Sequence, residues 1–146
     1  MSRSSEATMP KKGFDVSASL PWVSLLGRIL LSYIFAWSVV GDLTGWAGTT
    51  HYMASHGIPI PGLFLAGADI LKIVGVVLLV LGFRARFGAL CLLVFIIPAT
   101  FIFHNFWAIT GAGHLDAVLH FQKNLAIMGG LLMVIALGPG RWSISS

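Results

Sequence analysis

The sequence predicts an all-α membrane protein, a bundle of four transmembrane helices with a structured outer loop between the first and the second. Of the 146 residues, 57% are hydrophobic and only 10% are charged, and the mean hydropathy is +0.90. A soluble domain carries about 25% charged residues, because water must solvate its surface. This chain has too little charge for such a surface, and it contains four apolar stretches of membrane-spanning length.

The four apolar stretches define the expected helices in order. We expect spans at about residues 20–40, 63–81, 87–107 and 121–137. Each approaches the roughly 20 residues needed to cross a hydrocarbon core of about 30 Å. The first is expected to be a permanent helix, because no Ala-x-Ala cleavage site follows it. Pro98 inside the third is expected to bend that helix.

The segment before the first span is rich in serine and charge. We expect residues 1–18 to form a disordered cytoplasmic tail and residues 19–146 to form the transmembrane domain. The net charge of +4 comes from scattered basic residues, so we expect lipid and not nucleic acid as the partner. The single cysteine, Cys91, excludes an intrachain disulfide and a CxxC relay.

Basic residues predict the orientation in the membrane. The connections at residues 41–62 and 108–120 contain no Lys or Arg. The basic residues flanking the spans lie before the first, between the second and third, and after the fourth: Arg3, Lys11, Lys12, Arg84, Arg86 and Arg141. The positive-inside rule therefore predicts that both termini are cytoplasmic.

All five histidines fall on the predicted outer side: His51, His56, His104, His114 and His120. One interpretation is a metal, haem or proton-handling site. The other is that polar residues are simply tolerated in outer loops. Because no pair has a tight ligand spacing, we expect no metal site. His104 and His120, next to the spans, are the candidate ligand or proton-handling residues.

Charged and polar residues inside the spans form the most informative pattern. On a helical wheel the polar residues of the first span lie within about 120° of one another. Asp69 and Lys72 share a face in the second span. Such groups are costly in lipid and face the bundle interior. We therefore predict a central polar seam composed of Arg28, Asp42, Asp69, Lys72, Lys123 and Asn124.

Two interpretations of this seam remain open. It is either an ion-paired contact that fixes helix register, or a small pocket, open to the outer side, for a polar headgroup such as a quinone ring. Arg28 has no acidic residue at its level. Its guanidinium is expected to bind carbonyl groups or to extend towards the inner interface.

Several motifs occur together in a fixed order. They are GDLTGWAGT at 41–49, YMASHGIP at 52–59, LGFRAR at 81–86, HNFW at 104–107, KNLA at 123–126 and GPG at 138–140. Over about residues 21–145 the chain resembles the DoxX-type membrane proteins. The resemblance implies a four-helix bundle in the bacterial inner membrane. It links the chain to thiosulfate–quinone oxidoreductase, to membrane redox and detoxification complexes and, more distantly, to receptor assembly or cargo export.

Two charges depart from the family pattern. Asp42 stands where the family usually has Lys, and Lys72 stands where it usually has Glu. Because both signs are exchanged together, we predict a direct ion pair between the first and second helices. Asp69, on the same helix as Lys72, is the rival partner.

The resemblance leads us to expect a subunit or accessory of a quinone-linked redox or detoxification system, with quinone as its ligand. The chain lacks cysteine chemistry, haem-type histidine pairs within spans and a nucleotide loop, so we assign no catalytic residue. Two alternatives stay open: a factor for assembly or partner binding in a membrane complex, and a conduit for small molecules or protons through the seam.

Overall fold

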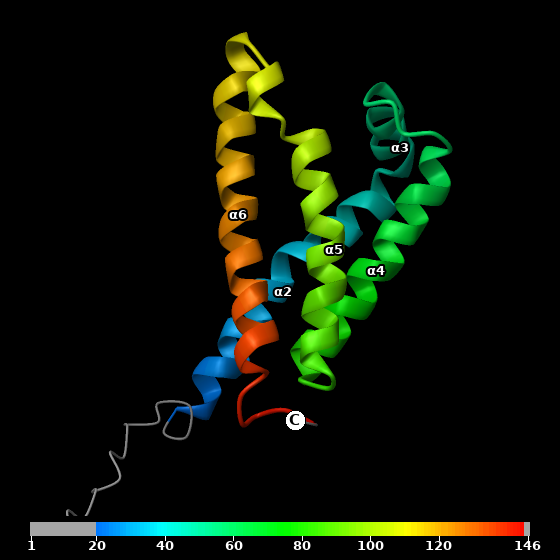
Figure 1. Ribbon diagram of the computed structural model, residues 1–146. Helices are drawn as coiled ribbons and strands as arrows, with labels where there is room; N and C mark the ends of the chain where they lie inside the picture. The colour runs from blue at the N-terminus through cyan, green and yellow to red at the C-terminus, as the bar shows by residue number, and fades with distance from the viewer. Residues whose placement is uncertain (1–19, 145–146) are drawn as a thin grey trace, which may run out of the picture.

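The computed structural model describes residues 20–144 and forms a bundle of four long helices (Figure 1). The long helices are α2 (Pro21–Thr44), α4 (Pro61–Leu81), α5 (Ala85–Phe103) and α6 (His114–Leu137). Each lies in a segment long and apolar enough to cross a membrane, and residues 20–144 contain no strand. The predicted all-α class with four spans is therefore confirmed. The predicted tail at residues 1–18 lies outside the described residues.

Short elements lie at one end of the bundle. The structured loop expected between the first two spans is helix α3 (Trp46–Ser55), and the 3-10 turns η1 (Phe106–Ala108) and η2 (Gly111–Gly113) join α5 to α6. They are at the top of Figure 1, whereas the α4–α5 loop and the C-terminus are at the bottom. We call the top the histidine end, after His51, His56, His104, His114 and His120. The bottom is the arginine end, after Arg84, Arg86 and Arg141.

The helices differ from the predicted spans at the histidine end. Helix α2 continues to Thr44, beyond the predicted end at residue 40, and α6 begins at His114 instead of residue 121. These added turns contain polar residues, including Asp42 and Asp116. An apolar run indicates only the part of a helix that lies in hydrocarbon. The helix itself extends beyond that part, because backbone hydrogen bonds continue through the polar residues that follow. Helix α5 remains helical through Pro98.

Proline and glycine set the limits of α4. Pro61 occupies the first turn, where its missing N–H costs no hydrogen bond. Gly82 ends the helix in the left-handed conformation, with φ of 73°. A Cβ atom on Gly82 would also collide with Nη1 of Arg28. Backbone conformation and close packing therefore both require glycine at this position.

Helices α4 and α5 approach closely through two glycines. A Cβ on Gly75 would lie 2.6 Å from Cγ of Leu92 and 3.0 Å from the carbonyl oxygen of Gly88. Lipid provides no hydrophobic drive for helix association, so close packing of small residues replaces it. The core beside this contact consists of Phe35, Leu79, Ala85, Ala89, Leu92, Ile96 and Leu131. Gly67, nearer the histidine end of α4, has open space around it.

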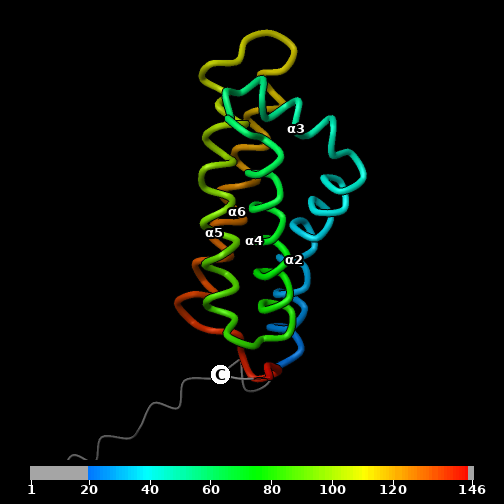
Figure 2. The backbone as a smooth tube through the Cα atoms, turned by 90° about the vertical axis from the view of Figure 1, so that its right-hand side faces the viewer, coloured from blue at the N-terminus to red at the C-terminus, as the bar shows by residue number. Residues whose placement is uncertain are grey.

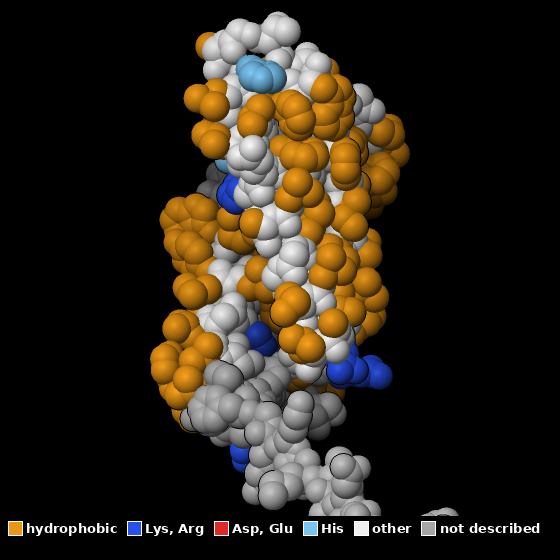
Figure 3. Space-filling model, turned by 60° about the vertical axis from the view of Figure 1, so that its left-hand side comes forward, with side chains coloured by type: hydrophobic (Ala, Val, Ile, Leu, Met, Phe, Trp, Pro, Cys, Tyr) orange, Lys and Arg blue, Asp and Glu red, His pale blue; other side chains and the backbone are white. Residues whose placement is uncertain are grey.

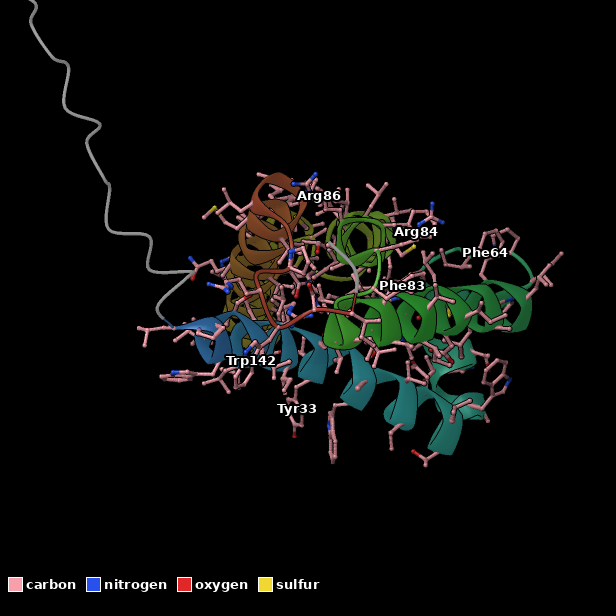
Figure 4. All side chains as sticks on the ribbon, turned by 90° about the horizontal axis from the view of Figure 1, so that it is seen from below. Tyr33, Phe64, Phe83, Arg84, Arg86 and Trp142 are labelled. Carbon is pink, nitrogen blue, oxygen red and sulfur yellow. The ribbon has the colours of Figure 1, made fainter. Side chains whose placement is uncertain are left out.

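Helix α2 packs on α4 and moves away from α6 towards the histidine end, as Figure 1 and Figure 2 show from two directions. Hydrophobic side chains cover most of the face seen in Figure 3. Tyr33 points from α2 away from the bundle when viewed from the arginine end (Figure 4). An exposed apolar surface of this extent suits contact with the acyl chains of a bilayer.

Arg28 holds the helices together at the arginine end through hydrogen bonds to backbone carbonyl groups. Its side chain is buried, and its Nη1 donates to the carbonyl oxygens of Leu79 at 3.1 Å and Val80 at 3.2 Å. Its Nη2 donates to the carbonyl oxygen of Trp142. Nearby, Oγ of Ser24 donates to the carbonyl oxygen of Pro139 at 2.5 Å. Of the two expectations for Arg28, binding to carbonyls is the one found, and it joins α2 to the end of α4 and to the C-terminal segment.

Replacing Arg28 by methionine is expected to destabilise the fold. The substitution leaves three carbonyl oxygens without their cationic donor, and hydrogen bonds to charged groups contribute about 1.5–3 kcal/mol each. We expect the free energy of unfolding in detergent, followed by circular dichroism, to fall by at least about 2 kcal/mol. Arg86→Met, at an exposed arginine of the same end, is the control. Equal stability of the two variants would show that the Arg28 contacts contribute little.

The separation of the two ends makes the orientation testable. Single cysteines placed at Arg84 or Arg86, in a Cys91→Ser background, are expected to react with a membrane-impermeant thiol reagent only from the cytoplasm. Cysteines at His51 or His114 should react only from outside, because no Lys or Arg flanks them in their connections. Labelling of His51→Cys only from the cytoplasm would show that the orientation in the membrane is the opposite of the predicted one.

Candidate functional site

A cavity of about 370 Å³ lies in the half of the bundle nearer the histidine end. Helices α2 to α6 all contribute to its wall. Its apolar lining includes Ile34, Phe35, Met53, Leu65, Phe95, Ile96 and Phe103. Its polar lining comes from three sides: Ser38, Asp42 and Lys72 from α2 and α4, Thr49 and Tyr52 from α3, and His104, Lys123 and Asn124 from the α5–α6 side. A pocket of this size and composition suits a small amphiphilic ligand.

Lys72 is the centre of a charged cluster on the α2–α4 side. Its Nζ lies 2.5 Å from Oδ2 of Asp42 and 2.8 Å from Oδ1 of Asp69, and it donates to Oγ of Ser38 at 3.0 Å. The predicted contact between Asp42 and Lys72 is therefore present. Asp69, expected as the rival partner, binds the same ammonium group, so the two interactions coexist. We call Asp42, Asp69 and Lys72 the lysine cluster.

The lysine cluster holds more carboxylate than ammonium. The contact of Asp69 with Lys72 is an ion pair with poor hydrogen-bond alignment, and neither oxygen of Asp69 accepts a hydrogen bond within residues 20–144. The ring of Phe95 covers another side of Lys72, with its centroid 4.9 Å from Nζ. Two acidic side chains thus share one cation among apolar neighbours.

Hydrogen-bonded side chains join α5 to α6 on the other side. Nδ2 of Asn124 donates to Oγ1 of Thr100 at 2.9 Å, and that hydroxyl donates to the carbonyl oxygen of Ile96 at 2.6 Å. Both Asn124 and Thr100 are buried. A satisfied polar contact of this kind holds two helices in register where lipid excludes water.

The two candidate histidines come together at the mouth of this side. The rings of His104 and His120 stack with their centroids 4.9 Å apart. Nδ1 of His120 lies 2.9 Å from Nζ of Lys123, and its Nε2 lies 3.5 Å from Oδ1 of Asp116. Asp116, His120 and Lys123 lie on one face of α6 because the helix begins at His114.

His56 and His114 make local contacts. Nδ1 of His56 lies 2.9 Å from the carbonyl oxygen of Tyr52, and its ring packs on Phe103. Nδ1 of His114 lies 2.9 Å from the carbonyl oxygen of Ile109. Within the described part of the chain, no three His, Cys, Asp or Glu side chains are grouped so that they could hold a metal ion.

The structure divides the polar seam that the sequence predicts. It brings Asp42, Asp69 and Lys72 together, and it brings Lys123 and Asn124 to the same cavity. Arg28 lies apart, at the arginine end, where it binds carbonyl groups instead of lining this cavity. The spacing of polar residues along one helix identifies its polar face. The tilt of α2 against the other helices decides at which level of the bundle the polar faces come into contact.

Sequence reasoning missed two contributions to the site. Thr100, buried in α5, is the partner of Asn124, and helix α3 supplies Thr49, Tyr52 and Met53 to the cavity wall. A lone threonine in an apolar span signals little, because its hydroxyl can bond to its own helix. The α3 residues lie in a connection whose fold is not visible from hydropathy.

An apolar groove adjoins the cavity on the α4–α5 side. The groove has a volume of about 350 Å³ and shares Met53, Ala68, Phe95, Ala99 and Phe103 with the cavity. Gly67 and Phe64 of α4 lie on its other wall, and Phe64 points away from the bundle in Figure 4. The polar cavity and the apolar groove therefore lie side by side and share these wall residues.

Comparison with known proteins gives consistent matches. The DoxX family model matches residues 23–105, and the SURF4 family model matches residues 66–146. Inner membrane protein YphA of Escherichia coli is 33% identical over 90% of this chain and 94% of its own length. Inner membrane protein YqjF of the same organism is 37% identical over 82% and 87%. The Surfeit locus protein 4 homologue of Schizosaccharomyces pombe is 27% identical over 84% of this chain but 36% of its own length. No solved structure matches.

The lysine cluster predicts a specific pattern of stability. Asp42→Lys and Lys72→Glu should each lower the free energy of unfolding by about 3–5 kcal/mol, because each leaves uncompensated like charges buried. The double exchange restores one cation between two carboxylates and should recover most of the loss. Unfolding in detergent measures this double-mutant cycle. Asp116→Asn, at an exposed carboxylate, should change stability little. Simple additivity of the two losses would show that the side chains do not interact.

Proposed function

The chain belongs to the DoxX family of multi-pass membrane proteins, and on this basis we propose that it binds a membrane quinone as a subunit or accessory of a quinone-linked redox or detoxification system. We place it in the bacterial inner membrane with both termini in the cytoplasm. Its role is to hold the quinone headgroup and present it to a partner enzyme. The bacterial relatives are inner membrane proteins, which supports the location.

The position of the polar cavity directly beside the apolar groove, with wall residues in common, supports this proposal. A quinone combines a ring that bears two oxygen atoms with a long isoprenoid tail. The cavity of about 370 Å³ offers polar groups on three sides and aromatic walls at Phe35 and Phe95. The groove offers an apolar path for the tail towards lipid. A ligand that enters from the bilayer remains in apolar surroundings except at its head.

A proton or solute conduit is less well supported. Between the lysine cluster and Arg28, α2 contributes one buried polar side chain, Ser32, and the apolar core around Leu79, Leu92 and Leu131 fills the bundle towards the arginine end. Beyond the core, Arg28 is engaged by backbone carbonyls. This arrangement suits a site that opens at one end of the bundle.

Two glycines allow the proposal to be tested with matched variants. Gly67 lines the groove, and no atom lies within 4 Å of the position that a Cβ would take there, so Gly67→Leu should fill the groove without disturbing the backbone. Gly129 of α6 has the same open surroundings and lines neither the cavity nor the groove. Gly129→Leu is therefore the control.

We expect protein purified in mild detergent to retain quinone, identified by mass spectrometry of a solvent extract. In binding titrations, Gly67→Leu should weaken the binding of a quinone with a long tail at least about tenfold, because several methylene groups of the tail can no longer be buried in the groove. It should leave a tail-less quinone ring unaffected, and Gly129→Leu should change neither. Absence of quinone from the extract, together with a stoichiometric copurifying protein, would instead support an assembly or partner-binding factor.

A further inference from the structure

We infer that the cavity selects the redox state of its ligand and binds a quinol more tightly than the corresponding quinone. This inference rests on the proposed function, because it takes a quinone-type molecule as the ligand. It is drawn from the hydrogen-bonding capacity that the side chains around the cavity leave unused.

The α2–α4 side of the cavity presents an acceptor. The side chain of Lys72 is only 1% exposed, and Asp42, Asp69, Ser38 and the ring of Phe95 surround its ammonium group. Its N–H groups are therefore not directed to a ligand. The Asp42 side chain keeps 16% exposure and lines the cavity. Its Oδ2 binds Lys72, and its Oδ1 accepts no hydrogen bond from any residue in 20–144.

The composition of the lysine cluster reinforces this preference. Asp42 and Asp69 share the single cation of Lys72, so the cluster has more acceptor oxygens than donors to satisfy them. A carboxylate in surroundings of low polarity interacts favourably with an O–H or N–H donor and unfavourably with a second acceptor. The free oxygen of Asp42 is the acceptor that the cluster offers to the cavity.

The α5–α6 side presents a donor. Lys123 lines the cavity, and its Nζ has one contact, 2.9 Å from Nδ1 of His120. An ammonium group has three N–H donors, so capacity remains for an acceptor on the ligand. The cavity is thus bipolar, with an acceptor at Asp42 and a donor at Lys123.

A quinol and a quinone fit this arrangement differently. Each quinol oxygen carries an O–H, so one hydroxyl donates to Asp42 while the other oxygen accepts from Lys123. Both quinone oxygens are acceptors only. A bound quinone would satisfy Lys123 but place a carbonyl oxygen against the Asp42 carboxylate, and an unsatisfied buried acceptor is costly. We expect the quinol to bind at least about tenfold more tightly.

The test compares three ligands built on the same tetramethyl-substituted ring, on the full-length protein in lipid nanodiscs without oxygen. They are duroquinone, duroquinol and the dimethyl ether of duroquinol, whose oxygens cannot donate. The expected order is duroquinol tightest, with the quinone and the ether at least about tenfold weaker. In Asp42→Asn the new amide group can donate to a carbonyl, so the ratio of the quinone and quinol dissociation constants should approach one. Because the ratio is taken within one variant, a change in the folded fraction cancels.

Asp116→Asn is the control for charge. Asp116 is an exposed carboxylate at the histidine end and does not line the cavity, so its removal should leave the ratio unchanged. Equal affinity for the quinone and the quinol, or an ether that binds as tightly as the quinol, would overturn the inference while leaving the proposed quinone site intact. Failure of all three ligands to bind would overturn both.

Discussion

The arrangement of this bundle depends on the interaction of the Lys72 ammonium group with the two aspartates Asp42 and Asp69. A charge at the centre of a membrane helix costs about 2.5–3.5 kcal/mol on insertion scales, so neither the lysine nor its two aspartates can face lipid. Burying them together ties α2 to α4 in the half nearer the histidine end. Once α2 is tied to α4, it leans away from α6, and the cavity lies among these helices.

The two ends of the bundle are built differently. At the arginine end, one buried guanidinium gathers carbonyl groups from α4 and the C-terminal segment, and the core packs directly above it. At the histidine end, α3 and the α5–α6 connection form the walls, and side chains with free hydrogen-bonding capacity face the cavity. The first arrangement provides rigidity, and the second provides a place for a ligand.

The exchange of charges that we infer from the resemblance to the DoxX family is compatible with the geometry of the ion pair. An ion pair between two helices depends on opposite signs and not on which helix carries which sign. With Asp42 on α2 and Lys72 on α4, the ammonium is enclosed and the carboxylate keeps contact with the cavity. A chain with the opposite placement would present its cation on α2 instead. The pair could thus be kept for stability while the chemistry offered to a ligand changes.

The sequence alone determined the number of helices, the class of protein and the contact between Asp42 and Lys72. These follow from apolar length, from the scarcity of charge and from a joint departure from a family pattern, all of which are local properties or pairwise ones. The tertiary structure decided that Asp69 shares the lysine, that Arg28 binds carbonyls far from the cavity, and that Thr100 meets Asn124. It also decided the cavity and the groove beside it. Those features depend on the tilt and rotation of each helix, which arise from close packing at places such as Gly75 and Gly88 and which hydropathy does not encode.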